Sequence, residues 1–99
     1  MQKQVHTIHF KADKDLLNFI DEKLDKLTLF YQGITNCEVY LKLEKDIHHE
    51  NKLVEIKLHV PGKELFAKKH SASFEEATNH ALEALKKQLI KEKELGLDG

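Results

Sequence analysis

The lysines near the end of the chain are the side chains best suited to binding a charged partner. Lys86, Lys87, Lys91 and Lys93 lie close together, and with Glu92 they give this segment a net charge of about +3 (four lysines minus one glutamate). All sixteen basic residues of the chain are lysines. A lysine ammonium binds phosphate as a point charge, whereas reading the edge of a guanine favours the bidentate fork of arginine. The composition therefore predicts that a nucleic-acid partner is held through its backbone and shape rather than its sequence.

Two further lysines, Lys23 and Lys26, lie on one edge of the apolar stripe of a predicted helix, whose outward face is acidic: Asp21, Glu22 and Asp25. Solvated charges that cover apolar edges would give the same pattern, and this is the usual explanation of a charge run. The clustering of lysines at the end of the chain weakens that explanation only modestly, so both interpretations stay open.

The exposed face of the predicted sheet is another candidate surface. It carries lysines interleaved with aromatic and imidazole side chains: Tyr40, Lys42, Lys57, His59, Phe66, Lys68 and His70. Such a face can stack bases and hold phosphates, as RNA-binding sheets do. Cross-strand packing on a solvated face, with Glu44 and Glu55 offsetting the lysines, is the alternative that we favour.

No arrangement in the sequence predicts catalysis or metal binding. His48 and His49 lie in a loop beside Glu50, while His6 and His9 lie on opposite faces of one strand. None of these groups offers three or four ligands at a recognised metal-binding spacing. No glycine-rich phosphate loop, Ser-His-Asp arrangement or pair of carboxylates is found. We therefore expect no enzyme activity, no cofactor and no small-molecule substrate.

The single cysteine, Cys37, bears on reactivity and on location. It points inward on its predicted strand, which is typical of a small core residue rather than a nucleophile. One cysteine cannot form an internal disulfide, which fits a reducing cytoplasm. The N-terminus lacks an apolar signal-peptide core, and no apolar run approaches membrane-spanning length. These features predict a cytoplasmic protein without a membrane partner.

The apolar pattern predicts six elements in the order β-α-β-β-β-α. Weak alternation over residues 5–10 gives the first strand, and helical spacing over 14–31 gives the first helix, with Asp13 as N-cap and Gly33 at its end. Alternation then assigns inward-facing residues to three strands: Cys37, Val39, Leu41 and Leu43; Val54, Ile56, Leu58 and Val60; Leu65 and Ala67. Pro61-Gly62 is a turn signal between the last two strands.

The last helix begins with a capping-box sequence at Ser73. The Ser73 hydroxyl is expected to accept a bond from the Glu76 amide, and the Glu76 carboxylate to reach back to the Ser73 amide. The helix has an apolar stripe: Phe74, Ala77, Ala81, Leu82, Leu85 and Leu89. A helical wheel separates its charged residues into two flanks: Lys87 and Lys91 with His80, and Lys86 with Lys93.

The element order predicts an α+β fold. Three successive strands joined by short loops favour an antiparallel meander, and each helix has only one apolar stripe to bury. We therefore expect a four-stranded sheet with both helices packed on one face. A chain of 99 residues fits one domain, which we expect to be residues 1–95, with 96–99 as a short flexible tail. The net charge is −1, so polyanion binding must come from a patch.

Four segments spread over the chain carry a resemblance to a known family. They are residues 34–45, ending Val39-Tyr-Leu-Lys-Leu-Glu-Lys45; the helical segment Lys23-Leu-Asp-Lys-Leu27; the turn His59-Val-Pro-Gly-Lys-Glu64; and Lys87-Gln-Leu-Ile-Lys-Glu-Lys93. In their order and spacing they resemble the short ribosome-hibernation factors, namely the hibernation-promoting factor and the ribosome-associated inhibitor A, for which sigma-54 modulation protein is an older designation. The resemblance spans essentially the whole chain and implies that family's β-α-β-β-β-α fold.

The resemblance implies a function. It implies binding to the small ribosomal subunit in the channel for messenger RNA and tRNA, contact with 16S ribosomal RNA, and inhibition of translation in stationary phase or stress. Family members make these contacts with basic residues on both helices, which by position assigns five residues to an RNA-binding site: Lys23, Lys26, Lys87, Lys91 and Lys93. We add Lys86 from its place in the basic cluster, and we expect the protein to be monomeric off the ribosome.

Two departures from the family pattern concern the last helix. Family members often begin it with Asp-Met/Phe-Tyr, where this chain has Ser73-Phe74-Glu75, and a basic residue common one turn before the Arg-Gln-Leu motif is Ala84 here. The chain also stops at Gly99 without the C-terminal dimerisation domain of the long hibernation factors, so we do not expect it to pair ribosomes by itself.

Two alternatives remain. Residues 13–93 read α-β-β-β-α, the order of a double-stranded-RNA-binding domain, but that domain places its lysines at the start of the last helix and this chain places them at the end. The other alternative is a small regulatory domain that acts through protein contacts.

Overall fold

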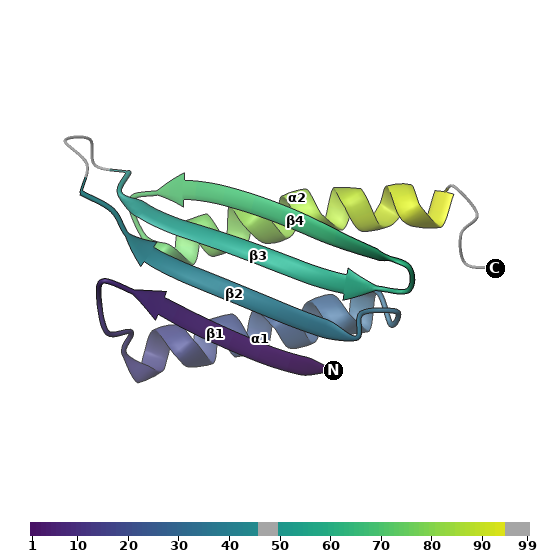
Figure 1. Ribbon diagram of the computed structural model, residues 1–99, viewed down its shortest axis with the longest axis horizontal. Helices are drawn as coiled ribbons and strands as arrows, with labels where there is room; N and C mark the ends of the chain where they lie inside the picture. Colours follow the sequence, from purple (N-terminus) through teal and green to yellow (C-terminus); the bar gives the residue numbers. More distant parts are fainter. Residues whose placement is uncertain (46–49, 95–99) are drawn as a thin grey trace.

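The computed structural model describes residues 1–45 and 50–94 of the chain. The elements follow the predicted order: β1 Gln2–Ile8, α1 Lys14–Phe30, β2 Asn36–Leu43, β3 Lys52–Val60, β4 Lys63–Ser71 and α2 Phe74–Glu94. The α+β fold is thereby confirmed (Figure 1). The predicted tail at 96–99 lies outside the described residues, and so do His48 and His49.

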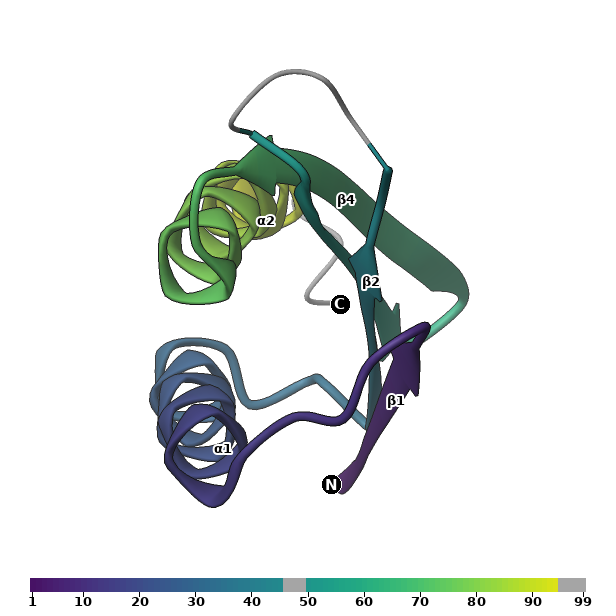
Figure 2. The ribbon, with the colours of Figure 1, turned by 90° about the vertical axis from the view of Figure 1, so that its left-hand side faces the viewer.

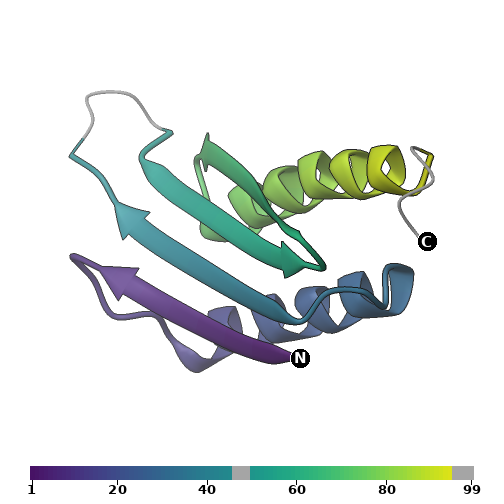
Figure 3. The ribbon, with the colours of Figure 1, turned by 45° about the vertical axis from the view of Figure 1, so that its right-hand side comes forward.

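The strands form a sheet in the order β1-β2-β3-β4, with β1 and β4 at its edges. β2, β3 and β4 are antiparallel neighbours, which confirms the predicted meander, whereas β1 pairs in parallel with β2. A parallel pair needs a crossover connection, which α1 supplies. Both helices cover the same face of the sheet and leave the other face bare (Figure 2). They run in the same direction, so their C-terminal ends lie at the same end of the molecule (Figure 3).

The core lies between the sheet and the two helices. The strand residues predicted to face inward are buried or half-buried, and the apolar stripe of each helix is buried as well. Fully buried side chains come from both layers: Ile20 and Leu24 of α1, Val39 and Leu41 of β2, Ile56 and Leu58 of β3, and Leu85 and Leu89 of α2. Cys37 is also fully buried, and burial raises the pKa of its thiol to about 12. It is thus a core residue and not a nucleophile, as the sequence predicts.

The first strand differs from its predicted position. The sequence predicts residues 5–10, but β1 begins at Gln2 and ends at Ile8. The first residues of β1 show no clear apolar alternation, yet they pair with β2 from Asn36 onward. An edge strand is held by backbone hydrogen bonds, and one of its faces is solvated, so its side chains carry a weak signal.

The backbone at the end of β1 explains why residues 9 and 10 are not part of the strand. His9 has a φ of 70°, in the left-handed region, and it follows the strand instead of lying on it. The predicted placement of His6 and His9 on opposite faces of one strand is therefore wrong. Phe10 leaves the sheet and stacks on Phe74 of α2, with ring centroids 4.6 Å apart. This contact joins the connection before α1 to the start of α2.

The caps of α1 follow the prediction at one end only. The Asp13 carboxylate accepts a hydrogen bond from the Leu16 amide at 2.8 Å, as expected of an N-cap. At the other end Tyr31 is the C-cap, in an extended conformation, and its amide donates to the carbonyl of Leu27 at 2.9 Å. Gly33 lies in the turn that follows and does not itself stop the helix.

Only one of the two hydrogen bonds of the predicted capping box is present at the start of α2. The Glu76 amide donates to the Ser73 hydroxyl at 3.1 Å, as predicted. The Glu76 carboxylate does not complete the box, because it accepts a hydrogen bond from the Ser71 hydroxyl at 2.7 Å. Ser71 is buried at the end of β4, where an unpaired hydroxyl would be costly. Glu76 therefore joins β4 to α2.

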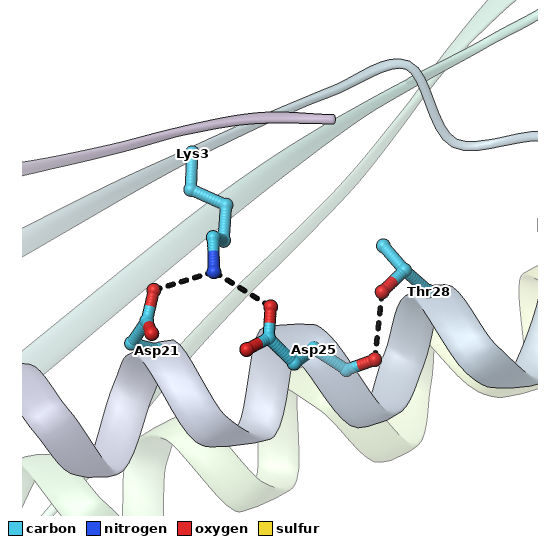
Figure 4. Close-up of polar contacts among 4 residues, drawn as sticks. All are labelled: Lys3, Asp21, Asp25 and Thr28. Atoms are coloured by element: carbon cyan, nitrogen blue, oxygen red, sulfur yellow. Dashed lines mark hydrogen bonds and ion pairs between the residues drawn. The ribbon is translucent and has the colours of Figure 1, made fainter.

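A lysine clamp holds the edge strand β1 to α1 (Figure 4). The Lys3 ammonium lies 2.6 Å from a carboxylate oxygen of Asp21 and 2.6 Å from one of Asp25, which are one helical turn apart. These two hydrogen bonds raise the pKa of Lys3. The two carboxylates do not simply face solvent, as the sequence suggests, because β1 supplies their counter-charge.

Candidate functional site

The inter-helix groove between α1 and α2 collects three of the predicted lysines. Its volume is about 250 Å³, and it is lined by residues of both helices: Lys23, Lys26, Leu27, Asn79, Leu82, Glu83 and Lys86. Leu27 and Leu82 are buried members of the core. The lining thus presents three lysines from the two helices, which can neutralise the phosphates of a nucleic-acid strand, beside the single carboxylate of Glu83.

Beyond this groove, two lysines of α2 converge on the end of α1. The Lys86 ammonium lies 5.8 Å from the ring centroid of Phe30, and the Lys93 ammonium lies 5.6 Å from the same centroid and 5.9 Å from that of Tyr31. An ammonium at this range is attracted to the face of an aromatic ring. Phe30 remains 39% exposed. It therefore combines an accessible ring with two neighbouring cations.

The position of these lysines also suits α1. The last turn of α1 contains no basic residue of its own, although the C-terminal end of a helix carries a partial negative charge. Lys93 of α2 lies beside Tyr31, the C-cap of α1. The α2 lysines are thus held where the α1 dipole favours cations.

The β4–α2 groove lies on the opposite flank of α2. Its volume is about 340 Å³, and its lining residues are Lys69, His80, Glu83, Ala84 and Lys87. The predicted separation of the α2 lysines into two flanks is thereby confirmed for Lys86 and Lys87. Lys91 lines neither groove and is exposed near the end of α2. The structure therefore gathers Lys23, Lys26 and Lys86 in one groove and places Lys93 with Lys86 beside Phe30, and it does not bring Lys87 and Lys91 into either group.

The predicted lysines share one electrostatic property. In the part of the chain that the structure describes, ion pairs hold Lys3, Lys42 and Lys63 but none of the following: Lys23, Lys26, Lys86, Lys87, Lys91 and Lys93. Some neighbouring acids are bound elsewhere, as Asp21 and Asp25 are by Lys3. Glu92, which lies between two of these lysines in the sequence, is buried and pairs with Lys63 of β4. The six ammonium groups are thus available to an external anion.

The bare face of the sheet is electrically balanced. Cross-strand neighbours place Glu38 opposite Lys57 and Glu55 opposite Lys68. Glu44 lies 2.7 Å from the ring of His70 and 3.9 Å from the Lys42 ammonium. This arrangement is the cross-strand packing that we favour from the sequence.

One aromatic side chain on the same face, that of Tyr40, is also occupied by neighbours. The Tyr40 hydroxyl donates to Glu38 at 3.2 Å, and its ring stacks on His6 with centroids 4.8 Å apart. Burial and the Glu38 carboxylate raise the pKa of Tyr40. The sheet face is therefore a weaker candidate for binding an anion than the helices.

Sequence reasoning missed two residues of this region, for different reasons. Phe30 follows Lys23 and Lys26 at helical spacing, and this signal could have placed it on the same flank of α1. Lys69 gave no local signal, because its place beside α2 depends on β4 being an edge strand. Phe30 and Lys69 both belong to the site through contacts with α2, an element that is distant from each of them in the sequence.

Other kinds of site find no support in the described residues. Across positions 1–45 and 50–94, no group of three or more His, Cys, Asp or Glu side chains is arranged to hold a metal ion. The histidine pair 48–49 lies outside these ranges. No described helix is both long and apolar enough to cross a membrane.

Comparisons with known proteins agree with one another. The sequence model of the family described as Sigma 54 modulation protein / S30EA ribosomal protein matches residues 4–95. A protein of Pseudomonas putida named ribosome hibernation promoting factor is 30% identical over 94 residues, which cover 95% of this chain and 88% of that protein.

Two experimental structures share the fold. A ribosomal subunit interface protein from Coxiella burnetii matches with a TM-score of 0.82 at 20% identity, over 94% of this chain and 98% of that one. The N-terminal domain of Protein Y from Thermus thermophilus matches with a TM-score of 0.70 at 19% identity, over 87% of this chain and 90% of that one. At these identities the likeness concerns the fold alone.

Proposed function

Because this chain belongs to the sigma 54 modulation protein / S30EA ribosomal protein family, we propose that it is a ribosome hibernation factor. It binds the small ribosomal subunit in the channel for messenger RNA and tRNA, contacts 16S ribosomal RNA, and inhibits translation in stationary phase or stress. The observation that carries this proposal is the family match over residues 4–95. The name of the Pseudomonas putida relative, ribosome hibernation promoting factor, points the same way.

The helix side of the molecule is the RNA-binding surface. It presents six lysines that form no ion pair with a described residue: Lys23, Lys26, Lys86, Lys87, Lys91 and Lys93. Point charges on flexible stems neutralise phosphates without reading base edges, as a contact with folded ribosomal RNA requires. The exposed ring of Phe30 adds a surface on which an unpaired base can stack.

Inhibition needs no catalytic group. A domain that fills the space of messenger RNA and tRNA excludes both by mass action, and no cofactor or small-molecule substrate takes part. The protein acts in the cytoplasm, where ribosomes are, and it is monomeric when it is not bound to them.

The alternatives fit the structure less well. A double-stranded-RNA-binding domain lacks a counterpart of β1, whereas here β1 pairs with β2 along its whole length. That domain also uses basic residues at the start of its last helix, where α2 carries Glu75 and Glu76. A regulatory domain acting through protein contacts is less well supported, because the Pseudomonas putida relative is named ribosome hibernation promoting factor.

Co-sedimentation with small subunits tests the proposal. The wild-type protein should migrate with them in a sucrose gradient, and the double variant Lys23→Gln, Lys26→Gln should be retained less. A matched control removes the same charge from the sheet face, in Lys57→Gln, Lys68→Gln, and should migrate like the wild type. Recovery of the wild-type protein only in the free fraction would refute the proposal and favour a protein-interaction domain.

A further inference from the structure

The β4–α2 groove brings together basic groups from two elements. Lys69 comes from β4, while His80 and Lys87 come from α2. In residues 1–45 and 50–94, none of these three side chains is in an ion pair. Neither the family match nor the sequence pattern assigns Lys69 or His80 to a site.

The position of Lys69 on its strand is unusual for a lysine. It pairs with Val54 of β3, and its side chain lies on the helix-covered face of the sheet, with Ala67 and Ser71. Those neighbours are buried, yet Lys69 is exposed because β4 is an edge strand. Lys68, the preceding residue, lies on the bare face opposite Glu55. Adjacent lysines of one strand therefore point to different sides of the molecule.

We propose that the β4–α2 groove binds a second segment of ribosomal RNA backbone through Lys69, Lys87 and His80, so that α2 lies between two RNA segments. This inference rests on the proposed function and extends it to a second surface. The inter-helix groove holds one segment with Lys23, Lys26 and Lys86. The β4–α2 groove holds the other, on the opposite flank of the same helix.

The lining of the groove favours a phosphate backbone over other partners. Two ammonium groups and an imidazole, all able to donate hydrogen bonds to phosphate oxygens, face a single carboxylate, that of Glu83. Ala84 is the only apolar lining residue. A drug-sized ligand requires mostly apolar walls, and a protein partner requires an apolar or aromatic anchor. Neither is present in this lining.

Glu83 distinguishes this arrangement from a simple basic patch. It lines both grooves, so its negative charge lies between the two proposed RNA segments. Like charges repel, and Glu83 should therefore weaken the binding of both segments. The variant Glu83→Gln should bind small subunits more tightly than the wild type and resist higher salt. An unchanged or lower affinity would overturn the arrangement of two segments about α2.

Lys69 and Lys68 offer a matched pair of variants. Affinity for small subunits is measured over a potassium series for the wild type, Lys69→Gln and Lys68→Gln. Losing one phosphate contact should lower the log–log salt slope by roughly one unit in Lys69→Gln only. Equal slopes for the two variants would overturn the inference, while the wild-type affinity would still support the proposed function. Failure of the wild type to bind would refute both.

Directed cleavage gives an independent readout. Cys37 is buried and its pKa is raised to about 12, so a cysteine introduced at the surface can be labelled selectively with a chelated iron probe. Probes at Lys69→Cys and Lys23→Cys should cleave different segments of 16S ribosomal RNA, and a probe at Lys68→Cys, on the bare face, should cleave the first of these segments less strongly than the probe at position 69. Cleavage from position 23 but not from position 69 would overturn the second RNA contact. With a photoreactive benzophenone probe in place of the iron chelate, crosslinking of position 69 to a ribosomal protein and not to RNA would also overturn it.

Discussion

At the scale of single residues, the lysines differ in where they find their counter-charge. Lys3 binds Asp21 and Asp25, and Lys63 binds Glu92, so these ammonium groups serve the fold. The helix lysines have no such partner among the described residues. Residue type alone could not separate these roles, because Lys3 and Lys23 look alike in the sequence, and only the packing of β1 beside α1 tells them apart.

Phe30 gives a residue-scale prediction. Stacking of a base on an aromatic ring contributes about 1–3 kcal/mol, so Phe30→Leu should weaken binding to small subunits by an amount in this range. The ring is 39% exposed, and we expect the free energy of unfolding to change by only about 1 kcal/mol. Phe66 on the bare sheet face is 43% exposed, which makes Phe66→Leu a matched control that should keep full affinity. Equal affinities would mean that Phe30 is only a packing residue.

Cys37 gives a prediction about pH. The unfolded chain loses its thiol proton near pH 8.5, roughly, but the folded chain keeps it until about pH 12. Ionisation thus favours the unfolded chain as pH rises between these values, and the free energy of unfolding should fall by up to about 1.4 kcal/mol per pH unit from this group.

Urea denaturation at several alkaline pH values checks this prediction. The variant Cys37→Ala lacks the thiol, so its stability should fall less steeply with pH than that of the wild type, whatever constant offset the smaller side chain introduces. Parallel curves for the two proteins would mean that the thiol is not held protonated by burial.

At the scale of elements, strongly periodic segments were predictable and contacts between elements were not. The apolar stripes of α1 and α2 and the alternation of β2 and β3 agree with the structure, because one face of each is buried. β1 was misplaced, since an edge strand is defined by its backbone pairing with β2. The predicted hydrogen bond from the Ser73 amide to the Glu76 carboxylate is absent among the described contacts, and this carboxylate accepts instead from Ser71, which lies outside the helix. The sequence predicts the two flanks of α2, but it does not predict that α1 lines one flank and that Lys69 of β4 lines the other.

The Lys3 clamp gives an element-scale prediction. Removing it in Lys3→Gln should loosen β1 and the adjacent turns of α1, because both carboxylates lose their partner at once. The groups are partly exposed, so the loss of global stability should be less than about 1 kcal/mol. Amide hydrogen exchange should accelerate in β1 while β3 stays protected. Lys57→Gln, on the bare face, is the control, and equal exchange in the two variants would show that the clamp does not hold β1.

At the scale of the whole molecule, a chain with a net charge of −1 presents two different faces. Carboxylates lie opposite lysines on the bare sheet face, and the helix acids Glu92, Asp21 and Asp25 are paired with lysines of β4 and β1. The six predicted lysines of α1 and α2, which have no ion pair among the described residues, all lie on the helix side, where the summed field can steer a polyanion. The net charge sums over both faces and carries no information on where the charges lie. Composition therefore limits nucleic-acid binding to a patch but does not locate that patch.

Titration of a cell-free translation reaction tests the central claim most directly. A protein that occupies the messenger RNA and tRNA channel should inhibit in proportion to the ribosomes present, reaching full effect near one protein per ribosome. Raising messenger RNA and initiator tRNA together should restore synthesis, because both compete for the same space. The Lys23→Gln, Lys26→Gln variant should inhibit less than the Lys57→Gln, Lys68→Gln control. No inhibition at an excess over ribosomes, or inhibition that competitors cannot relieve, would contradict hibernation by occupancy of the channel.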